Sequence, residues 1–311
     1  MHPALSVIVF TVASGAGYGL FALVALNVLV GLPFASPWQG LATLGTGAAL
    51  AGFGLLASSA HLGRPERAWR GLTQWRSSWL SREGIAALVT FVPAALQAWI
   101  WLEGRPSRLA AIALLIGAVA TVACTGMIYA SLKPIRQWRH PLVVPNYGLM
   151  AMSSGALLAC LFARCFGAPT ATLTLVAGVA LAAATACKIT YWAAIDRGRA
   201  ASTTVTATGL GAFDDVRLLD PPHTGSNYLL KEMGFRVARK HASKLRRGVL
   251  MLGFALPLAA TLGATLTGGT AGVALAALAV GANVAGTVVE RWLFFAEATH
   301  TVMLYYGTRS V

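Results

Sequence analysis

The residues best suited to chemistry are His61 and Glu83, which stand at the two ends of the segment HLGRPERAWRGLTQWRSSWLSRE (61–83). Each end adjoins an uncharged apolar run long enough to cross a bilayer. A histidine can donate a hydrogen bond and titrates near neutral pH, and a partly buried glutamate can shuttle a proton. A quinone has two carbonyl oxygens that gain or lose protons as electrons move, so this pair would suit such a lipid-soluble carrier.

The segment between these two residues predicts a short helix at the membrane interface. Trp69, Leu72, Trp75 and Trp79 recur at roughly helical spacing, with arginines among them. We expect Ser81 to cap the next helix and to place the glutamate in its first turn, where an anion is favoured. A purely structural role is therefore open as well, in which the histidine only caps a helix end and the arginines only fix the topology.

The composition indicates an integral membrane protein. Of the 311 residues, 57% are hydrophobic and 11% charged, against about 25% charged residues in soluble proteins. Because lipid offers no partner for free backbone N–H groups, the spans should be helices, and their many small residues favour close packing. We predict one all-α membrane-anchor domain over 1–311, a bundle of eight transmembrane helices with short interfacial helices on the cytoplasmic side. The expected spans are 5–30, 41–59, 84–101, 109–131, 143–163, 170–191, 249–267 and 271–293.

The distribution of basic residues predicts the orientation of this bundle. Eight spans put both termini on one side, and only Arg105, Arg108 and Arg164 fall on the other. The excess of lysine and arginine in cytoplasmic loops then places the termini and the loop 195–248 in the cytoplasm, in a bacterial inner membrane. Topology explains the basic composition, so we expect no nucleic-acid partner.

A second set of polar residues lies near the same end of the bundle. Lys188, Tyr191 and Trp192 share one side of the sixth span, and Glu290 and Arg291 lie near the end of the eighth. Ionisable groups within spans are costly and mark functional or pairing sites. The alternative is that the lysine reaches the interface and the glutamate pairs with a neighbouring arginine.

Other functions find less support in the sequence. A transporter would need polar groups near the bilayer midplane, and no strong charge lies there. All six histidines lie at span ends or in loops, so we predict no haem in this chain, and the four cysteines lack metal-site spacing, so we predict no metal.

The long polar segment predicts contact with the membrane or with a partner. SNYLLKEMGFRVARKHASKLRRG (226–248) has the pattern of a basic amphipathic helix, on lipid or against another protein. The stretch 205–225 contains Gly209, Gly211, Pro221 and Pro222, so we expect an extended loop over a docked protein.

Three stretches resemble the dimethyl sulfoxide reductase membrane-anchor family (DmsC-like): the segment 61–83, KEMGFRVARKHA and ERWLFFAEATH (290–300). The resemblance implies the third subunit of a heterotrimer, beside a molybdenum bis-pterin catalytic subunit and an iron–sulfur subunit. It also implies a site for ubiquinone or menaquinone near the last cluster. The family's quinone-site histidine and glutamate correspond to His61 and Glu83, and Arg64 and Arg67 match nearby positions.

We predict that the quinone site consists of His61, Arg64, Arg67, Trp75, Glu83, Lys188 and Glu290. Of these residues, we expect His61 and Glu83 to be catalytic. The chain would then carry the quinone half-reaction but not the substrate reaction. In the reductases of the family the segment faces the periplasm, whereas the basic residues here place it in the cytoplasm. A cytoplasmic location of this segment resembles the sulfite-oxidising branch of the family (SoeC-like), whose complexes pass two electrons from sulfite to quinone. The alternatives are an anchor of a reductase that oxidises menaquinol and, further away, a small-solute transporter.

Overall fold

The computed structural model describes residues 4–59, 62, 64–198, 200, 202–212, 216–220, 222–223, 225 and 237–311. Eight helices in these ranges are long and apolar enough to cross a membrane, and no β-strand occurs in them, which confirms the predicted all-α multi-pass class. The spanning helices are α1 (Leu5–Val30), α2 (Pro37–Ser59), α3 (Trp79–Leu102), α4 (Arg108–Ala130), α5 (Val143–Cys165), α6 (Ala171–Arg197), the seventh span (His241–Leu266) and α11 (Gly269–Ala296).

Several spans extend beyond their apolar runs. The third begins at Trp79 instead of 84, and the sixth continues to Arg197 instead of 191. The seventh combines α9 (Val237–Val249), a π-helical segment η2 (Leu250–Ala255) and α10 (Leu256–Leu266). The predicted amphipathic helix is thus continuous with this span from 237 onward, because no proline interrupts the helix there. Residues 226–236 of that prediction lie outside the described residues.

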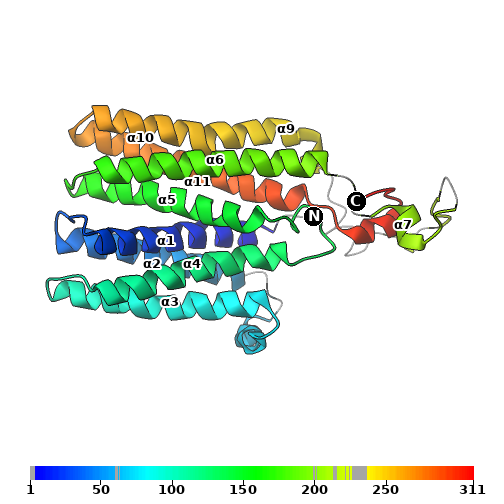
Figure 1. Ribbon diagram of the computed structural model, residues 1–311, viewed down its shortest axis with the longest axis horizontal. Coiled ribbons are helices and arrows are strands. Elements are labelled where there is room, and N and C mark those ends of the chain that lie inside the picture. Colours follow the sequence, from blue (N-terminus) through cyan, green and yellow to red (C-terminus); the bar gives the residue numbers. More distant parts are fainter. Residues whose placement is uncertain are drawn as a thin grey trace.

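The helices lie side by side, and their connections differ between the two ends of the bundle (Figure 1). Both termini lie at one end, which we call the terminus end. The short helices η1 (Pro65–Gln74), α7 (Thr204–Thr208) and η3 (Thr301–Tyr306) lie there too. Short loops join the helices at the opposite end. An even number of spanning helices accounts for the shared end of the two termini.

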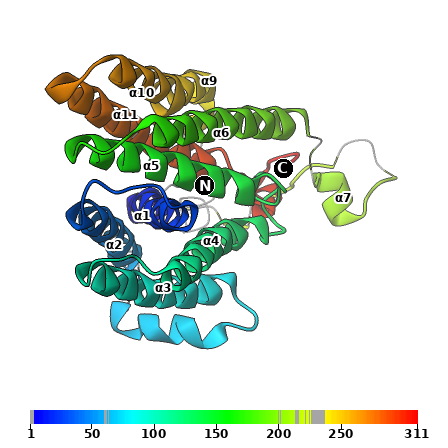
Figure 2. The ribbon, with the colours of Figure 1, turned by 60° about the vertical axis from the view of Figure 1, so that its left-hand side comes forward.

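Helix α1 lies in the middle of the bundle, against α2, α4, α5 and α11 (Figure 2). Its small residues allow this position. A Cβ atom on Gly17 would lie 2.6 Å from the carbonyl oxygen of Gly47 on α2, and one on Gly19 would overlap the carbonyl group of Ala151 on α5. Close approach of backbones through small residues is how helices associate in lipid. These contacts fix the side chains of α1 against those of its neighbours.

Polar contacts hold the loops of the terminus end against the helices. Trp138, in the loop between α4 and α5, donates an indole hydrogen bond of 2.9 Å to the carbonyl oxygen of Phe294 on α11. Ile135 in the same loop forms an isolated β-bridge with His300, which follows α11 in the chain. The end of α11 and the chain that follows it are thereby fixed beside α4 and α5.

Candidate functional site

Glu83 is buried inside the bundle, although it lies close to the start of α3. The N-cap of this helix is Ser78, whose hydroxyl oxygen accepts from the amide of Ser81 at 3.4 Å. The expectation that Ser81 caps the helix is therefore wrong. Its hydroxyl donates to the carbonyl oxygen of Gly71 on η1 instead. Glu83 lies beyond the first turn, about 6 Å along the axis from Trp79. The helix dipole consequently does not account for it.

The carboxylate of Glu83 has a hydroxyl as its hydrogen-bond partner. Thr125 Oγ1 on α4 donates to Glu83 Oε1 at 3.0 Å. The side chain is only 4% exposed, and no lysine or arginine of the described ranges lies within 4.0 Å of its oxygens. Tyr18 on α1 approaches the same part of α3, where its hydroxyl donates to the carbonyl oxygen of Ala87 at 3.1 Å.

The other predicted site residues of the segment 61–83 that the structure describes lie at the surface of the terminus end. Arg64, Arg67 and Trp75 are all exposed, and the guanidinium of Arg67 lies 4.0 Å from the carboxylate of Glu66 on the same helix. The structure does not bring these three side chains into contact with Glu83. His61 lies outside the described residues, so its predicted role stays a prediction.

Lys188, Glu290 and Arg291 form a buried ionic cluster. Their exposed fractions are 1%, 0% and 2%. Lys188 Nζ donates to one oxygen of Glu290, and Arg291 Nε donates to the other at 2.5 Å. The idea that the lysine extends to the interface is wrong, whereas the pairing of Glu290 with a neighbouring arginine is confirmed. Two cations share one carboxylate, so the cluster has a net positive charge.

Aromatic rings enclose this cluster toward the terminus end. Lys188 Nζ lies 4.6 Å from the ring centre of Tyr191 and 5.1 Å from that of Trp192. The guanidinium of Arg246 also lies near Trp192, 5.3 Å from the centre of its ring. Arg246 belongs to a polar cleft of about 210 Å³ and pairs with Asp196 and with Glu297, at 2.9 Å from the latter. Trp192 is thus close both to the buried cluster and to a residue of this cleft.

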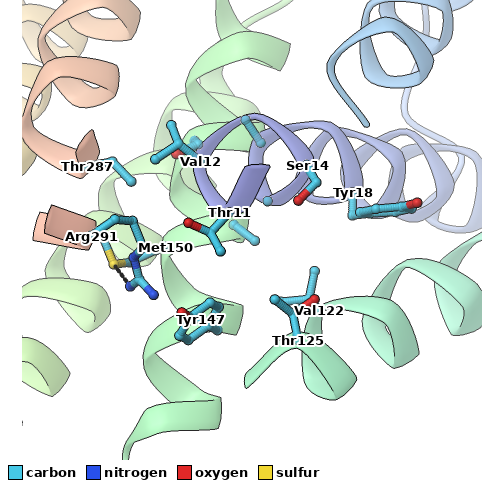
Figure 3. A pocket seen from close by; sticks show the side chains of 14 residues that line it. Thr11, Val12, Ser14, Tyr18, Val122, Thr125, Tyr147, Met150, Thr287 and Arg291 are labelled. Carbon is cyan, nitrogen blue, oxygen red and sulfur yellow. Dashed lines mark hydrogen bonds between the residues drawn. The ribbon is translucent and has the colours of Figure 1, made fainter. Parts of the chain in front are cut away.

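A small polar cavity lies between the ionic cluster and Thr125 (Figure 3). Thr11, Ser14 and Tyr18 of α1 face it from one side, and Thr125 of α4 from another. Its volume is about 20 Å³, roughly the space that one water molecule needs.

Arg291 closes the cavity on the side of α11. Its guanidinium lies 4.0 Å from the ring centre of Tyr147, and Nη2 lies 2.9 Å from the sulfur of Met150 (Figure 3). Arg291 Nη1 and the Tyr147 hydroxyl are buried without a hydrogen bond of ordinary geometry. Buried polar atoms are normally paired, and these two groups lie close enough to each other to interact.

Sequence reasoning missed the contribution of α1 and α4 to this site. Thr11, Ser14 and Tyr18 recur at helical spacing in an otherwise apolar span, and this polar stripe was the available signal. Thr125 and Thr121 lie on one face of α4 but gave a weaker signal, since a threonine in a span normally bonds to its own helix. Glu83 belongs to the predicted set and accepts from Thr125, which lines the cavity. Glu290 accepts from Arg291, which also lines the cavity, and from Lys188.

The eight-helix bundle and its buried charges define a multi-pass membrane subunit. Residues 1–211 match the model of the DMSO reductase anchor subunit (DmsC), and the chain belongs to this family. It is similar to the C subunit of the sulfite dehydrogenase of Allochromatium vinosum, with 32% identity over 325 residues that cover 98% of this chain and 99% of that protein. The chain is thus a membrane-anchor subunit of a multi-subunit molybdopterin oxidoreductase, as the resemblance implied.

Proposed function

We propose that this chain carries the quinone half-reaction of a sulfite-oxidising complex. A molybdopterin subunit would oxidise sulfite to sulfate, an iron–sulfur subunit would relay two electrons, and this chain would deliver them to ubiquinone or menaquinone. The similarity to a sulfite dehydrogenase component along the whole chain supports sulfite as the electron donor. The observation that carries the quinone assignment is Glu83, a buried carboxylate held by a threonine hydroxyl beside a polar cavity.

Reduction of a quinone consumes two electrons and two protons, and each proton must reach a carbonyl oxygen. A protonated carboxyl group at position 83 can donate one of them and can then be reprotonated from the aqueous phase. Glu290 is unsuited to this task, because two cations hold its charge in place. His61 is the proposed second hydrogen-bond donor. We propose that Arg64 and Arg67, exposed on the same segment, bound the site on its aqueous side.

The test uses the purified complex with both partner subunits. Glu83→Gln should lower sulfite-driven quinone reduction by about 10²-fold or more, the scale of lost acid–base catalysis. Sulfite oxidation with a soluble artificial acceptor should continue at the original rate. The matched control is Glu103→Gln, an exposed glutamate after the last residue of α3, at the opposite end of the bundle. An unchanged quinone rate in Glu83→Gln, or loss of the assembled complex, would contradict the proposal.

The reaction direction can be tested with the same preparation. A sulfite-oxidising complex should reduce quinone when sulfite is added. A reductase complex should instead oxidise menaquinol with a sulfoxide, and finding only that activity would overturn the sulfite assignment.

A further inference from the structure

An apolar groove lies between α1, α4 and α5, outside the polar cavity. Its volume is about 240 Å³. Val119 at its edge is 57% exposed, whereas Ala22 and Tyr18 of the central helix α1 are buried at its base. Every residue that lines it is apolar or glycine except Tyr18, whose hydroxyl is already bonded to Ala87 on α3. The groove therefore opens on the outer, apolar side of α4 and α5 and reaches the middle of the bundle.

The base of the groove adjoins the polar cavity. Tyr18, Val122 and Ala151 line both spaces. Val122 precedes Thr125 by three residues, a rise of about 4.5 Å along α4. Thr125 in turn holds the carboxylate of Glu83. An apolar path thus leads from the outer surface of the bundle to the hydroxyl that positions this carboxylate.

We propose that this groove binds the isoprenoid tail of the quinone. The inference rests on the proposed function and adds the place of the tail. A groove without free hydrogen-bonding groups excludes the quinone ring, whose carbonyl oxygens need donors, but accommodates an apolar chain. Its volume is below the ~300–1,000 Å³ of pockets that enclose a whole small-molecule ligand, so it holds a segment of the tail while the rest stays in lipid.

Gly148 allows the groove to be filled without disturbing the helices. It lies on α5 and lines the groove, and a Cβ atom there would have no neighbour within 4 Å. A leucine at this position places its side chain in the groove. The matched control is Gly281→Leu on α11, an exposed glycine that also has open space around its Cβ position and lies away from the groove.

The experiment measures sulfite:quinone activity of the whole complex in proteoliposomes, with a long-chain ubiquinone and with its tail-less analogue. Gly148→Leu should raise the KM for the long-chain quinone about tenfold or more, because several buried CH₂ groups are displaced. The KM for the tail-less analogue and the kcat for both should stay as in the wild-type complex. Gly281→Leu should change none of these values.

Two outcomes would overturn the proposal. Equal changes of KM for both quinones would mean that Gly148→Leu acts on the ring or on the fold. Unchanged KM values, with loss of a copurified phospholipid, would assign the groove to an acyl chain. Failure of the proposed function is a separate observation: the wild-type complex would reduce neither quinone, or Glu83→Gln would behave as the wild type.

Discussion

Thr125 Oγ1 and Glu83 Oε1 lie 3.0 Å apart across the contact between α4 and α3, although 42 positions separate them in the chain. The same hydroxyl lies 3.0 Å from the carbonyl oxygen of Thr121 in its own helix. Since a threonine hydroxyl has a single proton, Thr125 shares this proton between the carbonyl group of its own helix and the carboxylate on α3. This pair links the helix that carries Glu83 to the polar cavity.

Removal of this hydroxyl should slow quinone reduction. We expect Thr125→Val to lower kcat about tenfold, a loss of about 1.4 kcal/mol that is the scale of one hydrogen bond, with little change in KM. Because the threonine acts through Glu83, the double variant with Glu83→Gln should be no slower than Glu83→Gln alone. Steady-state kinetics of the complex measure both. Thr185→Val is the control, since its hydroxyl bonds within α6. Additive losses in the double variant would contradict this role.

The ionic cluster should respond very differently to loss of its anion and loss of one cation. Glu290→Gln leaves Lys188 and Arg291 buried without a counter-charge, and such a change typically costs about 3–5 kcal/mol. Lys188→Met leaves one complete ion pair and should cost less. Thermal unfolding in detergent should therefore show a much lower Tm for Glu290→Gln than for Lys188→Met. Equal losses, or a larger loss for Lys188→Met, would show that the carboxylate does not balance both cations.

Two histidines outside the spans should make stability depend on pH. His300 Nδ1 accepts from the amide of Val302 at 3.0 Å, and His140 Nδ1 accepts from that of Leu142 at 3.2 Å. Partial burial lowers the pKa of both, and Arg136 adds to the effect at His140. Since the unfolded chain takes up protons at a higher pH than the folded one, the free energy of unfolding should fall as pH drops below about 6.5.

His300→Asn tests this effect directly. Asparagine keeps an oxygen that can accept from the helix start but does not titrate. The Tm of the variant should fall less than that of the wild type between pH 7.5 and pH 5.5, a range of about one unit on either side of the ordinary pKa of histidine in an unfolded chain. An identical slope in both proteins would argue against a role for His300.

The packing of α1 predicts opposite effects for two glycines four residues apart. A methyl group on Gly19 overlaps the backbone of Ala151, whereas one on Gly15 has open space within 4 Å. Gly19→Ala should lower Tm and the yield of assembled complex. Gly15→Ala should be neutral or more stable by up to about 1 kcal/mol, through the higher helix propensity of alanine. A tolerated Gly19→Ala would mean that α1 and α5 are further apart.

The basic residues predict the compartment of the terminus end. A reporter enzyme fused to the C-terminus should be active in the cytoplasm, because only three lysine and arginine residues fall in the opposite loops. Periplasmic activity would contradict the orientation and, with it, the preference for a cytoplasmic sulfite-oxidising complex.

The sequence predicted the spans well and the site only in part. Lys188 and Glu290 were placed correctly at one end of the bundle, because helical position follows from counting residues along a span. Arg64, Arg67 and Trp75 are exposed at the surface. The spacing of these residues in the sequence could not show which face of the segment meets the bundle. The roles of Thr125 and Tyr18 depend on a neighbouring helix and could not be seen in either span alone.

By itself the sequence determined the eight spanning helices that the described residues form. Each apolar run must satisfy its backbone hydrogen bonds within itself in lipid, so a local pattern suffices. Only the tertiary structure decided which polar groups meet: Glu83 with Thr125, and Arg291 with Tyr147. The reason is that lipid is as apolar as the interior of the bundle, so hydrophobicity does not mark which face of a span turns inward.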